Sequence, residues 1–235
     1  MHKWTLILVT VVALGFTGQG LRANEVTVGL GNSTNCVPFG CAGAAGVTEY
    51  QQVYSLDSFN TYNPGGFTIA AVSFFTSDTN PAVTSGNYTI SFATTALSVG
   101  SLDVNLSQNA DLGSSQLFFQ GSLGGSVGSE FTIGGNGATP TYFYDPSMGS
   151  NLLIDISISN PGSDRGTFFT AEEFASSISR VTNAFVDPVN IGLVTTFSDV
   201  APPPPVVSTT PEPGSMLLFG TGLAAILRKA RRKAW

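Results

Sequence analysis

Asn151-Leu-Leu-Ile-Asp-Ile-Ser-Ile-Ser159 is the stretch that decides the fold. Leu or Ile occupies every second position from 152 to 158, whereas Asp155, Ser157 and Ser159 take positions between them. In an extended chain, alternate side chains point to opposite faces. One apolar face and one polar face are typical of a strand whose antiparallel sheet meets the core on one side and water on the other.

The same alternation recurs at 87–92, where Tyr88, Ile90 and Phe92 share a face. Further strands are expected at 25–30, 47–54, 67–76, 101–106, 115–122, 129–133, 141–144, 166–170, 179–186 and 191–197. Turn-forming segments rich in Asn, Pro and Gly, such as 63–66 and 160–162, separate them. Ten to twelve short strands at this spacing predict an all-β fold, an antiparallel β-sandwich of jelly-roll-like type.

Residues 171–177 are the only segment of the domain body that favours a helical turn, with Thr170 and Glu173 spaced as a capping box. No internal repeat of fixed period is visible, which argues against a solenoid or a propeller. We therefore expect one sandwich domain over residues 24–200.

Residues 1–23 have the features of a secretory signal peptide. Lys3 supplies the positive charge, residues 4–16 form the apolar core, and small residues follow. Cleavage is expected after Ala23, with cleavage after Gly20 as the alternative. The segment predicts export through Sec-type machinery.

Residues 201–210 begin Ala-Pro-Pro-Pro-Pro and predict a proline-rich linker. Such a run favours a stiff, extended polyproline conformation, which suits a spacer between the domain and a membrane. A docking site for a proline-binding module is the alternative.

Residues 211–235 contain three unlike blocks in a fixed order. The Pro211-Glu212-Pro213 triplet comes first, and an apolar run from Met216 to Leu227 follows it. At ~1.5 Å per residue this run spans roughly 18 Å as a helix, less than a hydrocarbon core of about 30 Å. We therefore expect a C-terminal hydrophobic helix that anchors the chain in the inner membrane only transiently. The basic residues that hold the end on the cytoplasmic side are Arg228, Lys229, Arg231, Arg232 and Lys233.

These blocks resemble the bacterial PEP-CTERM sorting signal. The resemblance implies an exosortase, an integral-membrane transpeptidase-like enzyme, that cuts near the triplet and releases or re-attaches the protein at the cell surface. An ordinary tail anchor or an unstructured hydrophobic tail is the alternative. A weaker resemblance, to uncharacterised secreted β-rich PEP-CTERM proteins, covers Gln51–Tyr54, Ser58-Phe59, Tyr142–Pro146 and Asn151–Asp155. It brings no assigned activity.

The charge of the body is strongly acidic. Residues 24–210 contain two arginines, no lysine and fourteen Asp or Glu, a formal net charge of −12. Such a surface excludes the electrostatic binding of nucleic acid and is repelled by anionic lipid. A neutral extracellular polysaccharide, or an association bridged by cations, is compatible with it.

His2 is the only histidine, and it lies in the expected signal peptide. Without an imidazole or a lysine, the mature domain has no base for Ser-His-Asp or Cys-His catalysis. Paired carboxylates could act on glycans, but spacing selects no pair among them, and we expect them to be solvated. We therefore predict no catalytic residue, no cofactor and no metal site. The carboxylates considered are Glu49, Glu130, Asp155, Glu172 and Glu173.

Cys36 and Cys41 frame Cys-Val-Pro-Phe-Gly-Cys, and in an exported chain they predict one short disulfide loop. Free thiols or a bond between chains are the alternatives.

Other residues allow three further functional interpretations. Calcium could be bound by the loop residues Asp78/Asn80 or Asn109/Asp111. Glycosylation sequons begin at Asn32, Asn87 and Asn105. A platform for stacking sugars could be formed by Tyr50, Tyr54, Tyr62, Tyr142, Phe143 and Tyr144.

The sequence thus favours an exported protein of the cell surface or extracellular matrix, with a structural or adhesive role and no enzymatic activity. A carbohydrate-binding module is the first alternative. A glycan-acting enzyme with two carboxylates is the second.

Overall fold

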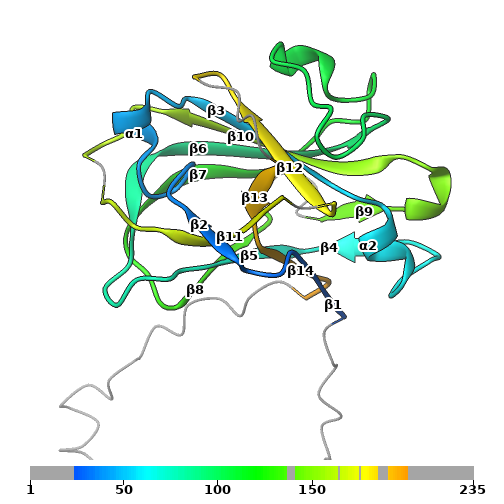
Figure 1. Ribbon diagram of the computed structural model, residues 1–235, viewed down its shortest axis with the longest axis horizontal. Coiled ribbons are helices and arrows are strands. Elements are labelled where there is room, and N and C mark those ends of the chain that lie inside the picture. Colours follow the sequence, from blue (N-terminus) through cyan, green and yellow to red (C-terminus); the bar gives the residue numbers. More distant parts are fainter. Residues whose placement is uncertain (1–23, 137–140, 164, 175, 185–189, 201–235) are drawn as a thin grey trace, which may run out of the picture. The chain divides into compact units, whose positions relative to one another are not determined.

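The computed structural model describes residues 24–136, 141–163, 165–174, 176–184 and 190–200. The expected signal peptide, proline-rich linker and sorting segment lie outside these residues. Within them, antiparallel strands dominate and the helices are single turns. The all-β prediction is confirmed, and the arrangement is sandwich-like (Figure 1).

A five-stranded sheet forms one layer, and β10 (Asn151–Ser159) lies at its centre. Ile154 of β10 lies opposite Gln52 on one side and Phe92 on the other. The alternating stretch that decides the fold is therefore the middle strand of the largest sheet. The strand order is β12 (Ile178–Thr182), β3 (Glu49–Tyr54), β10, β6 (Ala82–Thr95) and β7 (Gln116–Ser126).

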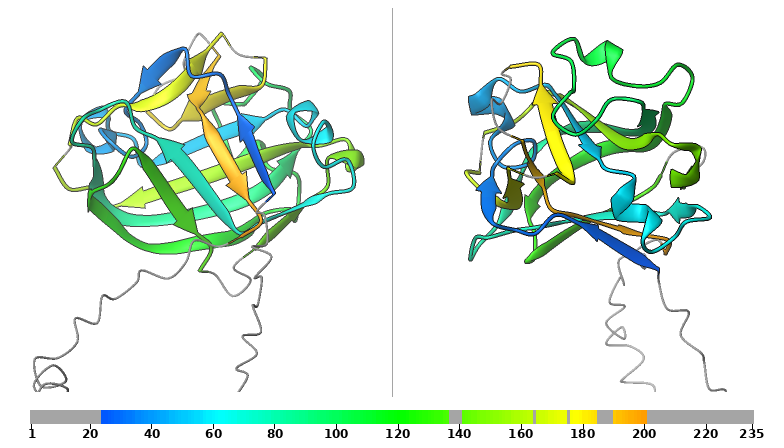
Figure 2. Two further views of the ribbon diagram at one scale, coloured as in Figure 1. Left: turned by 90° about the horizontal axis from the view of Figure 1, so that it is seen from below. Right: turned by 45° about the vertical axis from the view of Figure 1, so that its right-hand side comes forward.

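Three smaller sheets complete the described fold. Figure 2 (left) shows the four-stranded sheet crossing the longer strands of the five-stranded sheet. In order, its strands are β1 (Glu25–Val28), β14 (Thr195–Ser198), β5 (Ala71–Phe75) and β8 (Glu130–Gly134). A third sheet has three strands, in the order β13 (Ile191–Leu193), β11 (Phe169–Glu173) and β2 (Ser33–Asn35). The fourth sheet is the pair β4 (Phe67–Ile69) and β9 (Tyr142–Tyr144).

Short helical turns occur in the connections. They are α1 (Ala42–Ala45), α2 (Asp57–Asn60) and the 3₁₀ turns η1 (Leu106–Gln108) and η2 (Pro146–Met148). Asp145 caps η2, since its carboxylate accepts a hydrogen bond from the Ser147 amide.

The main core lies on the inner face of the five-stranded sheet. The apolar residues of β10 at positions 152, 154, 156 and 158 are all buried there, as the alternation predicts. Aromatic rings supply much of the remaining volume, including Phe74, Phe92 and Phe197. Each such side chain contributes roughly 1.5–3 kcal/mol through burial, so this core is the main source of stability.

The outer face of the same sheet differs from the expected solvated surface. Val53, Ala93 and Leu153 form a second buried cluster there, packed against Val99 and Leu102. The latter two belong to the long loop 96–115, which stands above the sheet in Figure 1. The polar face of β10 is therefore partly covered, because this loop folds back over it.

Two segment predictions are wrong. Residues 101–106, expected as a strand, belong to the loop 96–115 and end in η1. Residues 171–177, expected as a helical turn, begin inside β11, so the Thr170–Glu173 capping box does not form. Pairing of β11 with β2 and β13 satisfies that backbone and overrides the local helical signal.

Other strand boundaries differ because the chain changes sheets. The expected strand 67–76 is split at Ala70 into β4 and β5, which belong to different sheets. The expected strand 191–197 is split at Val194 into β13 and β14 in the same way. The three-residue strand β2 was not predicted, since it is too short to show a periodicity.

Candidate functional site

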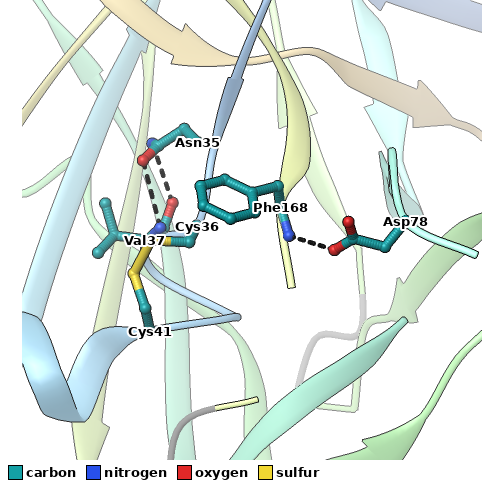
Figure 3. Close-up of a disulfide and its surroundings, with 6 residues drawn as sticks. All are labelled: Asn35, Cys36, Val37, Cys41, Asp78 and Phe168. Atoms are coloured by element: carbon teal, nitrogen blue, oxygen red, sulfur yellow. Dashed lines mark hydrogen bonds between the residues drawn. A yellow bond between two sulfur atoms is a disulfide. The ribbon is translucent and has the colours of Figure 1, made fainter. Parts of the chain in front are cut away.

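The disulfide between Cys36 and Cys41 is formed, which confirms the prediction (Figure 3). Their Cα atoms lie 5.3 Å apart. The Asn35 side chain fastens the loop by accepting from the Val37 amide at 3.3 Å and donating to the Val37 carbonyl at 3.1 Å. The disulfide and the amide together fix a tight loop next to β2.

Phe39, inside this loop, is fully buried in the core. Its ring centroid lies 4.8 Å from that of Phe74, and rings from β6, β8 and β11 surround it as well. The Phe39 carbonyl accepts from the Thr84 amide at 2.6 Å. At Gly40 a Cβ would lie 1.9 Å from the Thr167 carbonyl oxygen, so only glycine fits. The disulfide loop thus inserts a core side chain, in addition to restraining the chain locally.

Two of the four calcium candidates, Asp78 and Asp111, use carboxylate oxygens to close loops. Asp78 accepts from the Phe168 amide at 2.6 Å, as Figure 3 shows. Asp111 accepts from the Ala96 amide at 3.0 Å, and Asn109 is buried against Gln51. Asn80 is exposed. Among the described residues, no group of three or more His, Cys, Asp or Glu side chains is positioned to hold a metal ion.

A polar pocket of about 530 Å³ lies between the outer face of β3 and β10 and the loop 96–115. Glu49 and Gln51 of β3 share this face with Asp155 of β10. Because Asp155 pairs with Gln51 in the register, Glu49 and Asp155 are diagonal neighbours. The described lining contains no cationic side chain. Its other members are Val104, Asn105, Leu106, Ser107, Ala110 and Asn183.

Gln51 connects this pocket to the loop. Its Nε2 donates to Asp155 Oδ2 at 3.1 Å and to the Leu106 carbonyl at 3.2 Å. Its Oε1 accepts from Asn109 Nδ2 at 2.8 Å. Asp155 Oδ1 is buried and has no hydrogen-bond partner among the described residues. The carboxyl of Asp155 is therefore only half satisfied.

The electrostatics of the two carboxyls follow from this placement. Burial raises the pKa of Asp155, and the hydrogen bond from Gln51 offsets part of that rise. Burial also raises the pKa of Glu49, and the charge of Asp155 raises it further. Both effects favour the protonated forms, because a desolvated or doubled negative charge is unfavourable.

These shifts predict a pH-dependent stability. The folded state keeps the protons of Asp155 and Glu49 to a higher pH than the unfolded chain does. The contribution of these two groups to the free energy of unfolding is therefore fully present at acidic pH, and it is lost as pH rises through their raised pKa values. Asp155→Asn should reduce the fall in unfolding free energy between pH 4 and pH 7, measured by urea denaturation. Glu130→Gln, at an exposed site on β8, is the control and should keep the wild-type dependence. An unchanged dependence in Asp155→Asn would contradict this account of the pocket.

The other carboxylates lie on other sheets. Glu130 is exposed on β8. Glu172 is buried on β11 and accepts from Ser177 Oγ at 2.8 Å, and the backbone of Glu173 pairs with the side chain of Asn32. Of the carboxylates considered from sequence, the structure brings Glu49 and Asp155 together in one pocket.

The aromatic candidates divide into core and surface. Tyr50, Tyr54, Tyr142 and Tyr144 are buried, and burial raises the pKa of Tyr142 to about 12. The exceptions are Tyr62 and Phe143, which are 66% and 61% exposed. Most of the expected sugar-stacking platform is therefore core.

The sequon asparagines are engaged in local hydrogen bonds. Asn32 pairs with the Glu173 backbone, whereas Asn87 and Asn105 accept from Ser122 and Ser107 through their side-chain oxygens. These bonds give each side chain a structural role.

The predicted sorting residues lie outside the described part of the chain. They are Pro211, Glu212, Pro213, Arg228, Lys229, Arg231, Arg232 and Lys233. Among the residues that the structure describes, no helix is long and apolar enough to cross a bilayer.

Comparison with known protein families finds a match at the C-terminal end of the sequence. Searches of curated proteins and of solved structures found no match. A family model described as the PEP-CTERM protein-sorting motif matches residues 209–233, which include the triplet, the apolar run and the basic residues. The chain therefore carries a PEP-CTERM sorting motif, which implies an exported, envelope-associated protein that an exosortase processes.

Proposed function

We propose that the protein is a structural or adhesive component of the cell surface or extracellular matrix. The observation that carries this proposal is the match of residues 209–233 to the sorting motif, following an all-β domain in the chain. The absence of histidine and lysine from residues 24–210 supports a non-enzymatic role. The motif also makes the chain a substrate of a processing enzyme.

The processing scheme assigns one step to each segment. Sec-type machinery exports the chain, and residues 1–23 are removed as a signal peptide. Residues 216–227 then hold the chain in the inner membrane, and the five basic residues stay on the cytoplasmic side. The linker 201–210 keeps the sandwich away from the bilayer until the exosortase cuts near Pro211–Pro213.

Replacing Pro211, Glu212 and Pro213 with alanine tests this scheme. We expect the variant to stay in the membrane fraction at its uncut mass, because the processing enzyme no longer recognises it. Pro203→Ala with Pro204→Ala is the matched control in the linker and should be processed normally. Equal processing of both variants, read by mass spectrometry of membrane and soluble fractions, would refute the assignment.

The polar pocket supports carbohydrate binding as a second candidate function. Carboxyl and amide side chains hydrogen-bond sugar hydroxyls, and the described lining has no cation that would prefer an anionic ligand. Binding of the wild type to a glycan array, lost in Asp155→Asn and Glu49→Gln but kept in Glu130→Gln, would support it. No binding by the wild type would reject it. Glycan hydrolysis abolished by Glu49→Gln would instead indicate a two-carboxylate enzyme.

A further inference from the structure

Asn24 and Asp199, 175 positions apart in the chain, are joined by three hydrogen bonds. The Asn24 backbone nitrogen donates to Asp199 Oδ1, and its side-chain Nδ2 donates to Asp199 Oδ2, both at 2.9 Å. The Asp199 amide donates back to the Asn24 carbonyl at 3.2 Å. These bonds extend the β1–β14 ladder by one pair, beyond Glu25 and Ser198. Both carboxylate oxygens of Asp199 are therefore directed at one residue.

Asn24 is also the residue that follows the expected cleavage bond. Hydrolysis of the Ala23–Asn24 peptide bond consumes one water. Ala23 leaves with a carboxylate, and the nitrogen of Asn24 becomes an amine. An α-amino group has an ordinary pKa of about 7.7–8.0, so at neutral pH most of it is protonated and positively charged. The atom that donates to Asp199 Oδ1 would then be an ammonium nitrogen.

We propose that signal-peptide cleavage between Ala23 and Asn24 creates an α-ammonium group that Asp199 binds as an ion pair. The inference rests on the proposed export and processing. The donor and the acceptor already lie at hydrogen-bond distance, so the new charge strengthens an existing contact. Cleavage after Gly20 would leave the Asn24 nitrogen as a neutral amide, and Asp199 would have no cation there.

The ion pair fastens the two ends of the sandwich to each other. β1 is an edge strand of the four-stranded sheet and pairs with β14 over four residues. β14 ends at Ser198, just before the linker begins at residue 201. Asp199 therefore holds β1 at the position where the linker leaves the domain. In a body with only two arginines, the new ammonium would be its third cation.

The composition provides a direct test. Residues 24–210 contain no lysine, so the α-amine is the only primary amine of the fully trimmed product. In protein purified from the producing cells, we expect Asn24 as the first residue and slow labelling by an amine-reactive ester near pH 7.5. Since an exposed ion pair is worth up to about 1 kcal/mol, Asp199→Asn should speed this labelling about two- to fivefold. Asp57→Asn, at an exposed site on α2, is the control and should label like the wild type.

The outcomes separate this inference from the proposed function. A mature protein that begins at Leu21 would overturn the cleavage position and the ion pair, while leaving export intact. One that begins at Asn24 but labels equally fast in the wild type and Asp199→Asn would overturn the ion pair alone. A protein that retains Met1 would overturn both the ion pair and the proposed export with signal-peptide removal. Peptide mapping reads the α-amine separately from Lys229 and Lys233 if the tail is retained.

Discussion

Phe39→Ala is expected to lower the free energy of unfolding by about 3–5 kcal/mol, the usual range for removing a buried phenylalanine ring. The ring of Phe39 contacts Phe74 of β5, Tyr88 of β6, Phe131 of β8 and Phe169 of β11. It therefore connects three sheets. The disulfide and the tight turn at Gly40 hold its backbone, so the surroundings have little freedom to close the cavity.

Urea denaturation, monitored by far-UV circular dichroism, measures this loss. This signal does not depend on tryptophan, and Trp4 and Trp235 both lie outside the domain body. Phe143→Ala is the matched control. Its ring is 61% exposed, and we expect a change within about 0.5 kcal/mol. A loss below 1 kcal/mol for Phe39→Ala would show that the disulfide loop does not insert into the core.

Gln52→Met should lower the free energy of unfolding by roughly 2–3 kcal/mol, because it removes the partner of a buried amide. Gln52 is fully buried on β3. Its Oε1 accepts from the Leu193 amide at 2.6 Å, and its Nε2 donates to the Leu193 carbonyl at 2.9 Å. The hydroxyl of Tyr50 also donates to this Oε1. One side chain thus hydrogen-bonds the five-stranded sheet to β13.

Methionine keeps the length and most of the volume of glutamine, so the measured loss reports the hydrogen bonds. Thr195 Oγ1 also donates to the Leu193 carbonyl, at 2.9 Å, so this carbonyl keeps a partner in the variant, whereas the Leu193 amide loses the Gln52 oxygen as its acceptor. Gln120→Met on β7 is the control, since that side chain is exposed. Equal unfolding midpoints for the two variants would contradict the role given to Gln52.

The fold class could be predicted because strand alternation is a local property. Residues 151–159 are found as a strand with the expected apolar face in the core. The outer face could not be predicted in the same way. Leu153 lies on it, and only the long-range folding of the loop 96–115 explains its burial.

That loop also shows why a period of two can mislead. Leu102, Val104 and Leu106 alternate as the apolar residues of a strand do, and this pattern predicts a strand over residues 101–106. In the structure Leu102 packs on the second cluster, Leu106 is buried at η1, and Val104 is 61% exposed. The three side chains do not share one face of a strand, because the loop curves over the sheet.

The candidate pocket could not be predicted from the sequence for a related reason. Glu49 and Asp155 are 106 positions apart, and only the register of β3 against β10 makes them diagonal neighbours. Gln51 and Asn109, which connect the pocket to the loop, carry no motif. The sorting motif could be recognised, since its three blocks are contiguous in the chain.

The central claim is that an exported β-sandwich is trimmed of its hydrophobic C-terminal segment, and the mass of the mature protein from its own envelope tests it most directly. Intact-mass and peptide mass spectrometry should find a C-terminus upstream of Met216, with residues 216–235 absent. A mature protein that retains Trp235 would contradict the claim and indicate a permanent anchor.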